Sequence, residues 1–199
     1  MSKIVVLGAG ISGHTAAAHL RRKLSKEHEV LVVSPNRNYQ WVPSNIWVGI
    51  GRMKSKEVIF PLEPLYKRKG IGYKQAKAVS FHPEGDSSEA KPYILVEGVF
   101  GDNLGKQEKV TYDYLINATG PKLAFDMTEG LQPATNKVYS VCTYDHAEHA
   151  SEALHKLIDQ LKKSDKKAKI LIGTGHAKAT CQGAAFEYIL NVEKELQKF

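Results

Sequence analysis

The sequence predicts an α/β fold with a parallel sheet, and three observations support this fold class. A β-branched run near the first residue leads into a glycine-rich turn and then into a helical pattern. Several further strand-like runs, separated by turn-rich segments, occupy the middle of the chain. A second glycine turn introduces another helical pattern near the last residue. Strands that alternate with helices in this way are typical of parallel sheets covered by helices.

The first elements form a βαβ unit. A short apolar strand over 3–7 is followed by a glycine turn, a helix over 14–24 and a second strand over 29–33. A continuous apolar run is typical of a strand buried in a parallel sheet. Strand, crossover helix and strand in this order make up the framework of dinucleotide-binding domains.

The turn between the first strand and the helix reads Gly8-Ala-Gly10-Ile-Ser-Gly13, which is the G-x-G-x-x-G pattern. Gly8 permits the tight turn, Gly10 lets the backbone approach a pyrophosphate, and Gly13 allows the helix to pack closely on the strand. The N-terminus of the helix offers free N–H groups and a partial positive charge to the phosphates. A plain strand-to-helix turn is the alternative, but the position of the pattern within a βαβ unit favours dinucleotide binding.

The end of the second strand departs from the usual pattern. Such sites commonly carry an acid there for the ribose hydroxyls, whereas this chain has Val33-Ser34-Pro35-Asn36. Ser34 can still donate to and accept from a ribose hydroxyl, although a carboxylate would bind more strongly. We therefore expect a dinucleotide whose ribose contact is of a different kind.

The segment after the second strand is a long loop over 35–53 that holds Tyr39, Trp41 and Trp47. Long loops in compact domains are usually functional or disordered, and the aromatic content argues against disorder. A short helix bounded by prolines is expected next, over 57–70.

The middle of the chain contains further strands and then an amphipathic helix. Three strand-like runs, over 73–81, 93–100 and 109–112, precede a final strand over 114–120 that ends in an Ala-Thr-Gly turn. A helix is predicted over 145–163 because apolar residues recur there at helical spacing. Its apolar stripe consists of Ala147, Ala150, Leu154, Leu157 and Leu161.

The second glycine turn lacks the third glycine of the pattern. A predicted strand over 169–172 leads into Gly173-Thr-Gly175, but Lys178 stands where the third glycine would be. A side chain at that packing position should hold helix and strand apart. We predict the start of a second Rossmann-like domain that no longer binds NAD. The predicted organisation is a first domain over 1–125, a connecting segment and helix over 126–166, and a truncated second domain over 167–199.

The 199 residues have an ordinary globular composition and a formal net charge of +7. No apolar run approaches the ~20 residues that a membrane-spanning helix needs, and the first residues carry no signal-peptide pattern. Lysines cluster over 66–70 and 163–169; solvated surface is the simpler interpretation, and weak attraction to an anionic lipid or substrate is the alternative. We expect no nucleic-acid partner, because these lysines are not interleaved with aromatic residues.

The two cysteines, Cys142 and Cys181, form no C-x-x-C pair, and no His/Cys spacing resembles a zinc site. His146 and His149 lie three residues apart on the predicted helix without a further ligand nearby in the sequence. We therefore predict a surface histidine pair and no metal site.

The inserted strands between the βαβ unit and the Ala-Thr-Gly turn point to FAD rather than NAD. This arrangement looks like the Rossmann-like FAD-binding domain of the two-dinucleotide-binding-domain flavoproteins. Five motifs extend the resemblance over essentially the whole chain: GAGISG, NYQWVPSNIWVGIG, YDYLINATGPKLAF, SVCTYDHA and CQGAAFEY. Together they are similar to sulfide:quinone oxidoreductases and to the flavoprotein subunit of flavocytochrome c sulfide dehydrogenase.

This resemblance implies a flavoenzyme. In that family sulfide attacks a protein disulfide or polysulfide, a cysteine sulfur passes two electrons to FAD, and the flavin reduces a quinone, or a cytochrome in the relative. The cofactor-binding positions that the pattern and the resemblance imply are Gly8, Gly10, Ser12, Gly13, Ser34, Pro43, Ser44, Asn45, Val79, Thr119, Gly120 and Lys122.

The family's redox cysteine, in the motif Cys-Thr-x-x-His-Ala, maps to Cys142. Thr143 is a candidate N-cap for the helix that follows, so Cys142 would lie at the N-terminus of that helix, where the dipole favours a thiolate. The alternative for an isolated cysteine is a small buried hydrophobic side chain.

Glu187 and Cys181 are further candidates. Glu187 could face the flavin and shuttle protons if burial raised its pKa; an exposed acid that complements the helix dipole is the alternative. Cys181 matches a motif position outside the redox pair of the family, so we favour a structural role over a disulfide with Cys142.

The chain departs from the family in several places. Phe125 occupies the position at which many members carry an additional cysteine. The partner cysteine of Cys142, a segment that closes over FAD, and amphipathic membrane helices belong to the C-terminal half of the family, which these residues do not include. The chain is therefore expected to correspond to an N-terminal half that is inactive alone.

The resemblance also implies partners and a location. We expect sulfide and quinone as substrates, peripheral membrane association of the full-length enzyme, and otherwise a cytoplasmic protein; a homo-oligomer is left open. Two other functions are considered: a type II NADH:quinone oxidoreductase, which would need an intact NAD site, and a non-catalytic flavin-binding or interaction fragment.

Overall fold

The structure is a computed structural model that describes residues 1–132, 138–179 and 181–199. The chain divides into two compact units, the first made of residues 1–39 and 60–121, the second of residues 40–59 and 122–199. Each unit is built from two separate segments, and the segment 40–59 groups with the C-terminal part of the chain rather than with its sequence neighbours.

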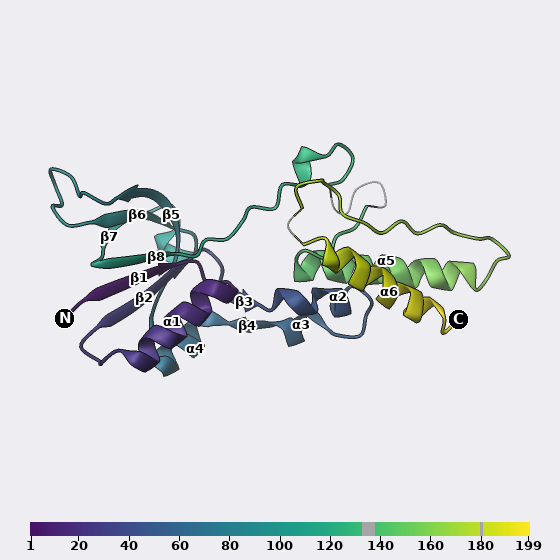
Figure 1. The fold of residues 1–199 in the computed structure, drawn as a ribbon, viewed down its shortest axis with the longest axis horizontal. Coiled ribbons are helices and arrows are strands. Elements are labelled where there is room, and N and C mark those ends of the chain that lie inside the picture. The colour runs from purple at the N-terminus through teal and green to yellow at the C-terminus, as the bar shows by residue number, and fades with distance from the viewer. Residues whose placement is uncertain (133–137, 180) are drawn as a thin grey trace. The chain divides into compact units, whose positions relative to one another are not determined.

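The first unit contains a six-stranded sheet with the order β7-β6-β5-β2-β1-β8 (Figure 1). The pairs β8–β1, β1–β2 and β2–β5 are parallel, whereas β5–β6 and β6–β7 are antiparallel and form a meander. This arrangement confirms the predicted α/β class with strands inserted before the last parallel strand. The strands are β1 (Lys3–Leu7), β2 (Glu29–Ser34), β5 (Gly72–His82), β6 (Tyr93–Gly98), β7 (Gln107–Thr111) and β8 (Tyr114–Asn117).

Two helices, α1 (Ile11–Lys23) and α4 (Leu62–Lys69), cover one face of this sheet (Figure 1). Ala17 of α1 and Tyr66 of α4 are fully buried in one cluster with Val6, Val30 and Val32. Successive strand residues point to opposite faces, so the alternate residues pack on the other side against the meander. That second cluster contains Val5, Leu7, Leu31, Val33, Ala76, Ile94, Val96 and Val110.

The predicted long loop contains short regular elements, and the predicted helix over 57–70 is wrong as a single element. A short strand interrupts it, because Pro61 biases the residue before it, Phe60, towards extended backbone, and the second helix begins only after Pro61. Pro64 is tolerated because it lies in the first helical turn, where no N–H is needed. The elements of this region are β3 (Asn38–Gln40), η1 (Val42–Ser44), α2 (Asn45–Val48), α3 (Ser55–Val58) and β4 (Ile59–Pro61).

In the second unit, α5 (Tyr144–Leu161) and α6 (Gly183–Leu196) pack with α2. Ile158 is buried together with Leu154 and Val192, whereas Leu157 and Leu161 of the predicted stripe are only partly buried. Because an α-helix has 3.6 residues per turn, Ile158, four residues after Leu154, lies on the same face of α5 as Leu154. Short 3₁₀ turns occur at η2 (Gly101–Asn103) in the first unit and η3 (Phe125–Met127) in the second.

The predicted strand over 169–172 is wrong. These residues are irregular, and the side chain of Leu171 is 87% exposed. A strand needs a neighbouring strand for its backbone N–H and C=O groups, and among the described residues none pairs with this segment. The helical pattern that follows is present as α6, but it begins only at Gly183.

Candidate functional site

The first glycine turn lies at the carboxyl end of β1, where the strand order reverses. β1 pairs with β2 on one side and with β8 on the other, and all three strands are parallel. In open α/β sheets, ligands bind outside the carboxyl ends of the strands at such a switch point. The topology therefore puts the G-x-G-x-x-G turn where a dinucleotide is expected.

Two of the three glycines are required by close backbone packing. Gly8 has a φ of 94°, and a Cβ there would lie 2.2 Å from the carbonyl oxygen of Ala118. A Cβ on Gly13 would lie 2.1 Å from the carbonyl oxygen of Gly8. The Gly8 N–H donates to the Val33 carbonyl at 2.8 Å, and the Ala118 N–H donates to the Leu7 carbonyl at 2.8 Å. The ends of β1, β2 and β8 are thus joined tightly around the turn.

The remaining glycine faces open space. No atom lies within 4 Å of the Cβ position of Gly10, which is also the N-cap of α1. No side chain caps this helix, and its first turn contains no acid, so its first N–H groups are free to bind an anion. Ser12 is exposed in the same turn. These residues fit the pyrophosphate of a dinucleotide.

The turn after β8 adds a second glycine with left-handed backbone. Gly120 has a φ of 72°, and its Cβ position is open. The Thr119 side chain and N–H donate to Asn117 Oδ1 at 2.9 and 3.3 Å. Ala118 and Asn117 were missed as determinants of the site, although the Asn-Ala-Thr-Gly run directly after a strand could have indicated them.

The predicted adenosine contacts lie in different environments. Ser34 is 1% exposed, and its Oγ accepts from the Asn36 N–H at 3.3 Å. Val79 is 48% exposed and lies where the β5–β6 register shifts, between Ala78 and Ser80. Their roles at the ribose and the adenine stay predictions.

In the second unit, Asn45 carries a buried donor without a partner. Asn45 is the first residue of α2 and is only 1% exposed. Its Oδ1 accepts a hydrogen bond from Gln40 Nε2 at 3.2 Å. Its Nδ2 has no hydrogen-bond partner in the structure, and an unsatisfied buried donor is costly. An acceptor on a cofactor would fit this group. Pro43 and Ser44 precede it in η1, and Lys122 is exposed.

Cys142 is exposed at the start of α5. It directly precedes the N-cap Thr143, whose Oγ1 accepts from the His146 N–H at 3.4 Å, so the predicted cap is confirmed. The Cys142 N–H donates to Ser140 Oγ at 3.1 Å. A buried hydrophobic role for Cys142 is excluded by its exposure, and the thiol is accessible to a solute.

Asp145 contributes negative charge at the same end of α5. Partial burial tends to raise the pKa of its carboxyl, but hydrogen bonds from the Thr143 side chain and from backbone N–H groups outweigh this and lower the pKa. A carboxylate here competes with a thiolate on Cys142 for the positive end of the helix dipole.

The other predicted catalytic residue is less favourably placed. Glu187 is exposed on α6, so the burial that its proton-shuttle role requires is absent. Cys181 is also exposed and free, so packing gives no support to a structural role. Within the described ranges, no three His, Cys, Asp or Glu side chains could hold a metal ion.

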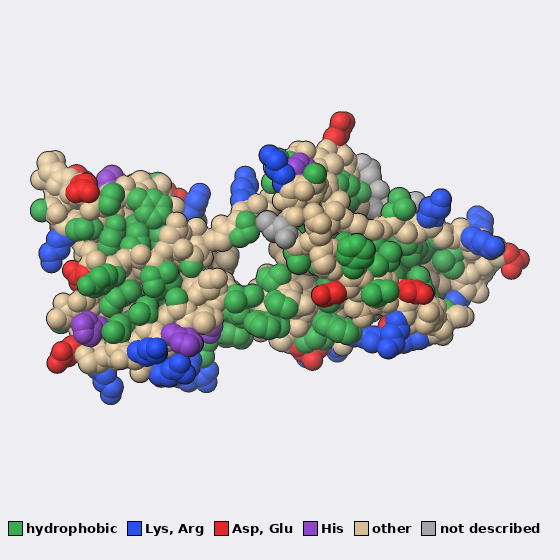
Figure 2. All heavy atoms as spheres, in the orientation of Figure 1, with side chains coloured by type: hydrophobic (Ala, Val, Ile, Leu, Met, Phe, Trp, Pro, Cys, Tyr) green, Lys and Arg blue, Asp and Glu red, His purple; other side chains and the backbone are tan. Residues whose placement is uncertain are grey.

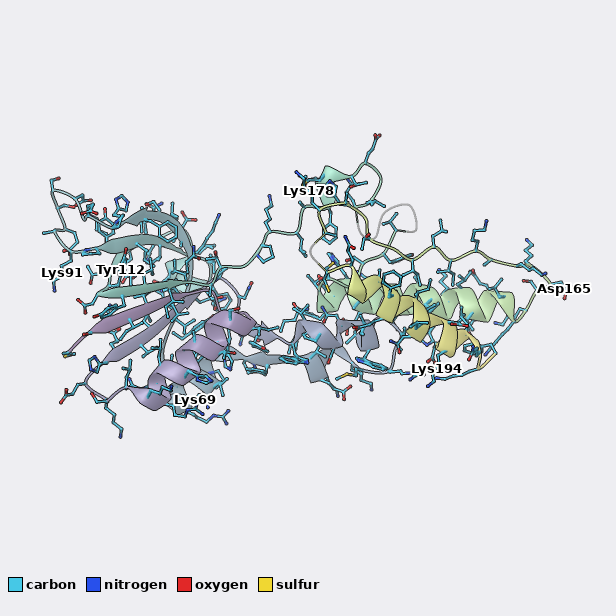
Figure 3. The ribbon with its side chains drawn as sticks, viewed as in Figure 1. Lys69, Lys91, Tyr112, Asp165, Lys178 and Lys194 are labelled. Atoms are coloured by element: carbon cyan, nitrogen blue, oxygen red, sulfur yellow. The ribbon has the colours of Figure 1, made fainter. Side chains whose placement is uncertain are left out.

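The second glycine turn has no strand before it. Lys178 is exposed, and its N–H donates to His176 Nδ1 at 3.0 Å; Figure 3 labels it on this irregular segment. A hollow beside the turn is lined by Ile172, Gly173, Thr174, Gln182, Ala185, Phe186 and Ile189. No glycine there supports a pyrophosphate in the way that the first turn does.

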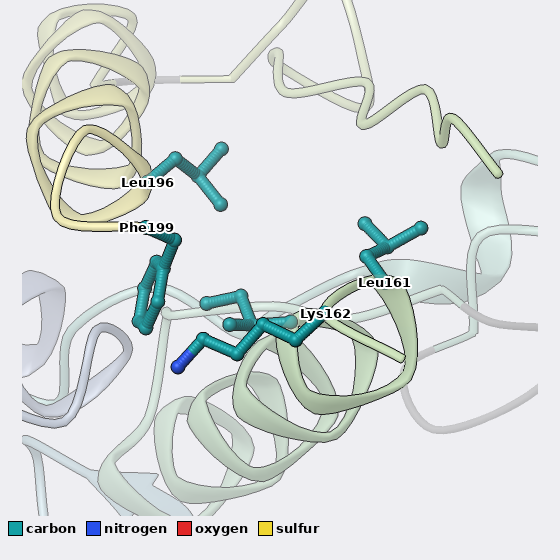
Figure 4. Close-up of a pocket in the computed structure, with 5 residues that line it drawn as sticks. Leu161, Lys162, Leu196 and Phe199 are labelled. Carbon is teal, nitrogen blue, oxygen red and sulfur yellow. The ribbon is translucent and has the colours of Figure 1, made fainter. Parts of the chain in front are cut away.

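A second hollow in this unit lies between the C-terminal ends of α5 and α6 (Figure 4). The Lys162 ammonium lies 4.0 Å from the centre of the Phe199 ring, and Leu161 and Leu196 line the rest with Ile158. None of the predicted site residues lines it.

Comparisons with known proteins show which family the chain resembles. The family model described as pyridine nucleotide-disulphide oxidoreductase matches residues 2–181. The sulfide-quinone reductase of Aquifex aeolicus is 28% identical over 195 residues, which cover 98% of this chain and 39% of the relative. The type II NADH:quinone oxidoreductase of Haemophilus influenzae is 28% identical over 176 residues, which cover 87% of this chain and 38% of that protein.

Among solved structures, the sulfide:quinone oxidoreductase of Aquifex aeolicus matches with a TM-score of 0.74 and 25% identity. The match covers all of this chain and 40% of that structure, so the chain spans well under half the length of the relatives it matches. The resemblance to sulfide:quinone reductases is thereby confirmed, and these relatives bind FAD. The chain belongs to the pyridine nucleotide-disulphide oxidoreductase family.

Proposed function

We propose that this chain forms the FAD domain and one redox cysteine of an enzyme that oxidises sulfide and passes the electrons to a quinone. The observation that carries the proposal is the likeness to a sulfide-quinone reductase over 98% of the chain. In this chain Cys142 is exposed and lies directly before the N-cap of α5. When bound, FAD accepts two electrons from a sulfur nucleophile and hands them to the quinone.

The residues of the chain have separate tasks in this proposal. The open Gly10 position and the uncapped start of α1 bind the pyrophosphate. Asn45 Nδ2 supplies a donor that has no protein partner. Cys142 is free in this chain, so the proposed step requires it to be joined in a disulfide or polysulfide to a sulfur that these residues do not supply. Sulfide then forms a new S–S bond to one sulfur of that pair, the old S–S bond breaks, and its electron pair stays on the other sulfur, which becomes the nucleophile that meets the flavin. Glu187 stays a proposed proton carrier, although the exposed position of its side chain gives this role no support.

The test of this function is a flavin titration on the full-length protein. Sulfide should bleach the flavin absorbance and a soluble quinone should restore it, whereas NADH should leave the absorbance unchanged. Bleaching by NADH alone would favour the second candidate, a type II NADH:quinone oxidoreductase. The 28% identity to the Haemophilus influenzae enzyme is the observation that supports this candidate.

The cysteine assignment needs its own test. Cys142→Ser should abolish reduction by sulfide while leaving FAD bound, since the residue contacts sulfur rather than the pyrophosphate turn. Cys181→Ser is the matched control, because Cys181 is also exposed and free, and it should retain reduction by sulfide. Equal loss in both variants would contradict the assignment.

A non-catalytic flavin-binding fragment is the third candidate. The 199-residue chain should retain little or no FAD through gel filtration if the remaining part of the relatives' length contributes to the cofactor site. A stoichiometric yellow complex would instead favour a self-contained flavin-binding unit. Peripheral membrane association of the full-length enzyme and self-association are further parts of the proposal; among the described residues no helix is long and apolar enough to span a bilayer.

A further inference from the structure

The first unit has a basic edge on the side of the sheet opposite the glycine turn. α1 connects the parallel strands β1 and β2, and α4 leads into β5, which is parallel to β2. Both helices therefore run antiparallel to these strands, and both pack on the same face of the sheet. Their C-terminal ends therefore lie towards the edge where the strands begin. The glycine turn lies at the carboxyl ends of the strands, and the C-terminal ends of the two helices lie towards the other ends.

The last turns of both helices are rich in cations. Within 64–83 the sequence contains no carboxylate, and within 19–28 it contains only Glu27. Figure 2 shows Lys and Arg side chains gathered over the region of α1 and α4, and Figure 3 labels Lys69 there. We call this surface the basic edge; it consists of Arg21, Arg22, Lys23, Lys26, Lys67, Arg68 and Lys69.

The helix dipole accounts for only part of this charge. Cations stabilise a helix C-terminus, and Arg21 is used locally because its guanidinium donates to the carbonyls of His28 and Leu24 at 2.7 and 3.1 Å. Arg22 Nη2 lies 3.3 Å from His19 Nδ1. In the described ranges, the cations that form salt bridges are all elsewhere: Lys3, Arg52, Lys74, Lys109 and Lys198.

Among the described residues, no cation of the basic edge forms a salt bridge, and Glu27 is the one carboxylate within its two sequence windows, so these charges repel one another. Lys67, Arg68 and Lys69 are consecutive and exposed, and the field of Lys69 reaches the buried side of α1, where it adds to the effect of burial in lowering the pKa of His14. An external polyanion would relieve this repulsion.

We propose that the basic edge binds an anionic lipid surface. Lys and Arg side chains attract anionic headgroups over a Debye length without inserting into the bilayer. Nucleic acid fits less well, because single-stranded binding needs exposed aromatic rings and Tyr66, the one aromatic residue of α4, is fully buried. The proposal rests on the proposed function in one respect: a quinone acceptor is dissolved in a membrane.

Vesicle co-sedimentation of the full-length protein tests this inference without sulfide or quinone. The probe is phosphatidylcholine vesicles with and without phosphatidylglycerol, at low and at physiological salt. Binding should require the anionic lipid and fall with salt. The triple variant Lys67→Glu, Arg68→Glu, Lys69→Glu should lower the bound fraction by roughly tenfold or more, because each of its charges attracts the surface.

The matched control reverses three exposed lysines of the same unit, Lys77→Glu, Lys91→Glu and Lys106→Glu, which changes the net charge equally. It should lower binding far less than the basic-edge variant. Gln in place of Glu at the three basic-edge positions gives a milder variant if the first one folds poorly by circular dichroism, and it should still weaken binding.

Three outcomes would overturn the inference: equal losses in both triple variants, equal binding to neutral vesicles, or tighter binding to a DNA duplex than to anionic vesicles at the same salt. Flavin reduction by sulfide with a water-soluble quinone, measured without vesicles, tests the proposed function separately. If the protein reduces the soluble quinone but does not bind anionic vesicles, only the basic-edge proposal is contradicted.

Discussion

The two glycine turns of this chain have similar sequences and different surroundings. At the first turn, Cβ atoms on Gly8 and Gly13 would lie 2.2 and 2.1 Å from carbonyl oxygens. At the second, a Cβ on Gly173 would meet nothing within 4 Å, and one on Gly175 would meet only the flexible end of Leu131, at 2.8 Å. The first turn follows β1 inside a six-stranded sheet, whereas no strand precedes the second.

This difference shows what gives a glycine pattern its meaning. A glycine is required where two backbones approach so closely that a Cβ has no room. That approach occurs at the first turn because β2 and β8 hold β1 on both sides. Without such neighbours a glycine only makes the chain flexible, and a lysine at position 178 is tolerated.

The largest effect should come from Gly8→Ala. The left-handed φ of 94° and the contact with the Ala118 carbonyl should together lower the free energy of unfolding by about 3 kcal/mol. Urea denaturation followed by circular dichroism measures this. Gly173→Ala is the matched control and should change the free energy of unfolding by less than about 0.5 kcal/mol. A comparable loss in both variants would remove the distinction between the two turns.

The next effect should come from Gly10→Val, which separates cofactor binding from folding. Because the Cβ position of Gly10 is open, the free energy of unfolding without cofactor should change little. The affinity for FAD should fall by about ten- to a hundredfold, a loss of about 1.4 to 3 kcal/mol, since the side chain occupies the space through which the pyrophosphate approaches. Fluorescence titration of the apoprotein with FAD gives the affinity. Unchanged affinity would mean that the cofactor does not lie over this turn.

A smaller effect is expected from acid, through His14 on α1. Burial and then the charge of Lys69 lower the pKa of His14 from its ordinary value of 6.5, and its Nδ1 lies 3.2 Å from Tyr66 Oη. The unfolded chain therefore takes up a proton at a higher pH than the folded chain does. The stability present above pH 6.5 is lost progressively as the pH falls from 6.5 through the lowered pKa of folded His14.

The measurement is urea denaturation as a function of pH. His14→Gln, which keeps a polar group but does not titrate, should flatten part of the acid dependence. His19→Gln on the exposed side of the same helix should leave the pH profile as it is. If both profiles match that of the unmodified protein, the protonation of His14 does not contribute to the loss of stability in acid.

The smallest effect should come from Lys178→Gly, which completes the glycine pattern in the second turn. We expect no gain in NADH binding, because the turn lacks the preceding strand that would orient it. Equilibrium dialysis with NADH on the unmodified protein and the variant tests this. Binding that appears only in the variant would show that Lys178 alone, rather than the missing strand pairing, separates the two turns.

Much of the first unit could be predicted because its signals are local. The apolar runs of β1 and β2 and the glycine spacing between them indicate a βαβ unit within a single stretch of sequence. The N-cap at Thr143 is likewise a contact between residues that are close in sequence. The candidate site could be predicted only in part, since the resemblance indicated Cys142 and Asn45 but not their exposure or burial.

The remaining features depend on contacts between distant segments. The run over 169–172 is as apolar as a strand, yet a strand forms only where another supplies hydrogen-bond partners. The division of 57–70 by β4 was also missed, because proline effects compete with helical spacing there. The identity of Ile158 as a core residue depends on which face of α5 meets Val192.

The sequence by itself determined the βαβ unit, the glycine turn inside it and the exposure of the basic residues at the end of α4, since each depends on neighbouring residues. Only the tertiary structure decided that Gly8 has no room for a side chain, because the Ala118 carbonyl follows β8, more than a hundred residues away in the sequence. It also decided that the second glycine turn has no sheet to support it. Backbone packing across long sequence separations is the physical reason, and no local pattern encodes it.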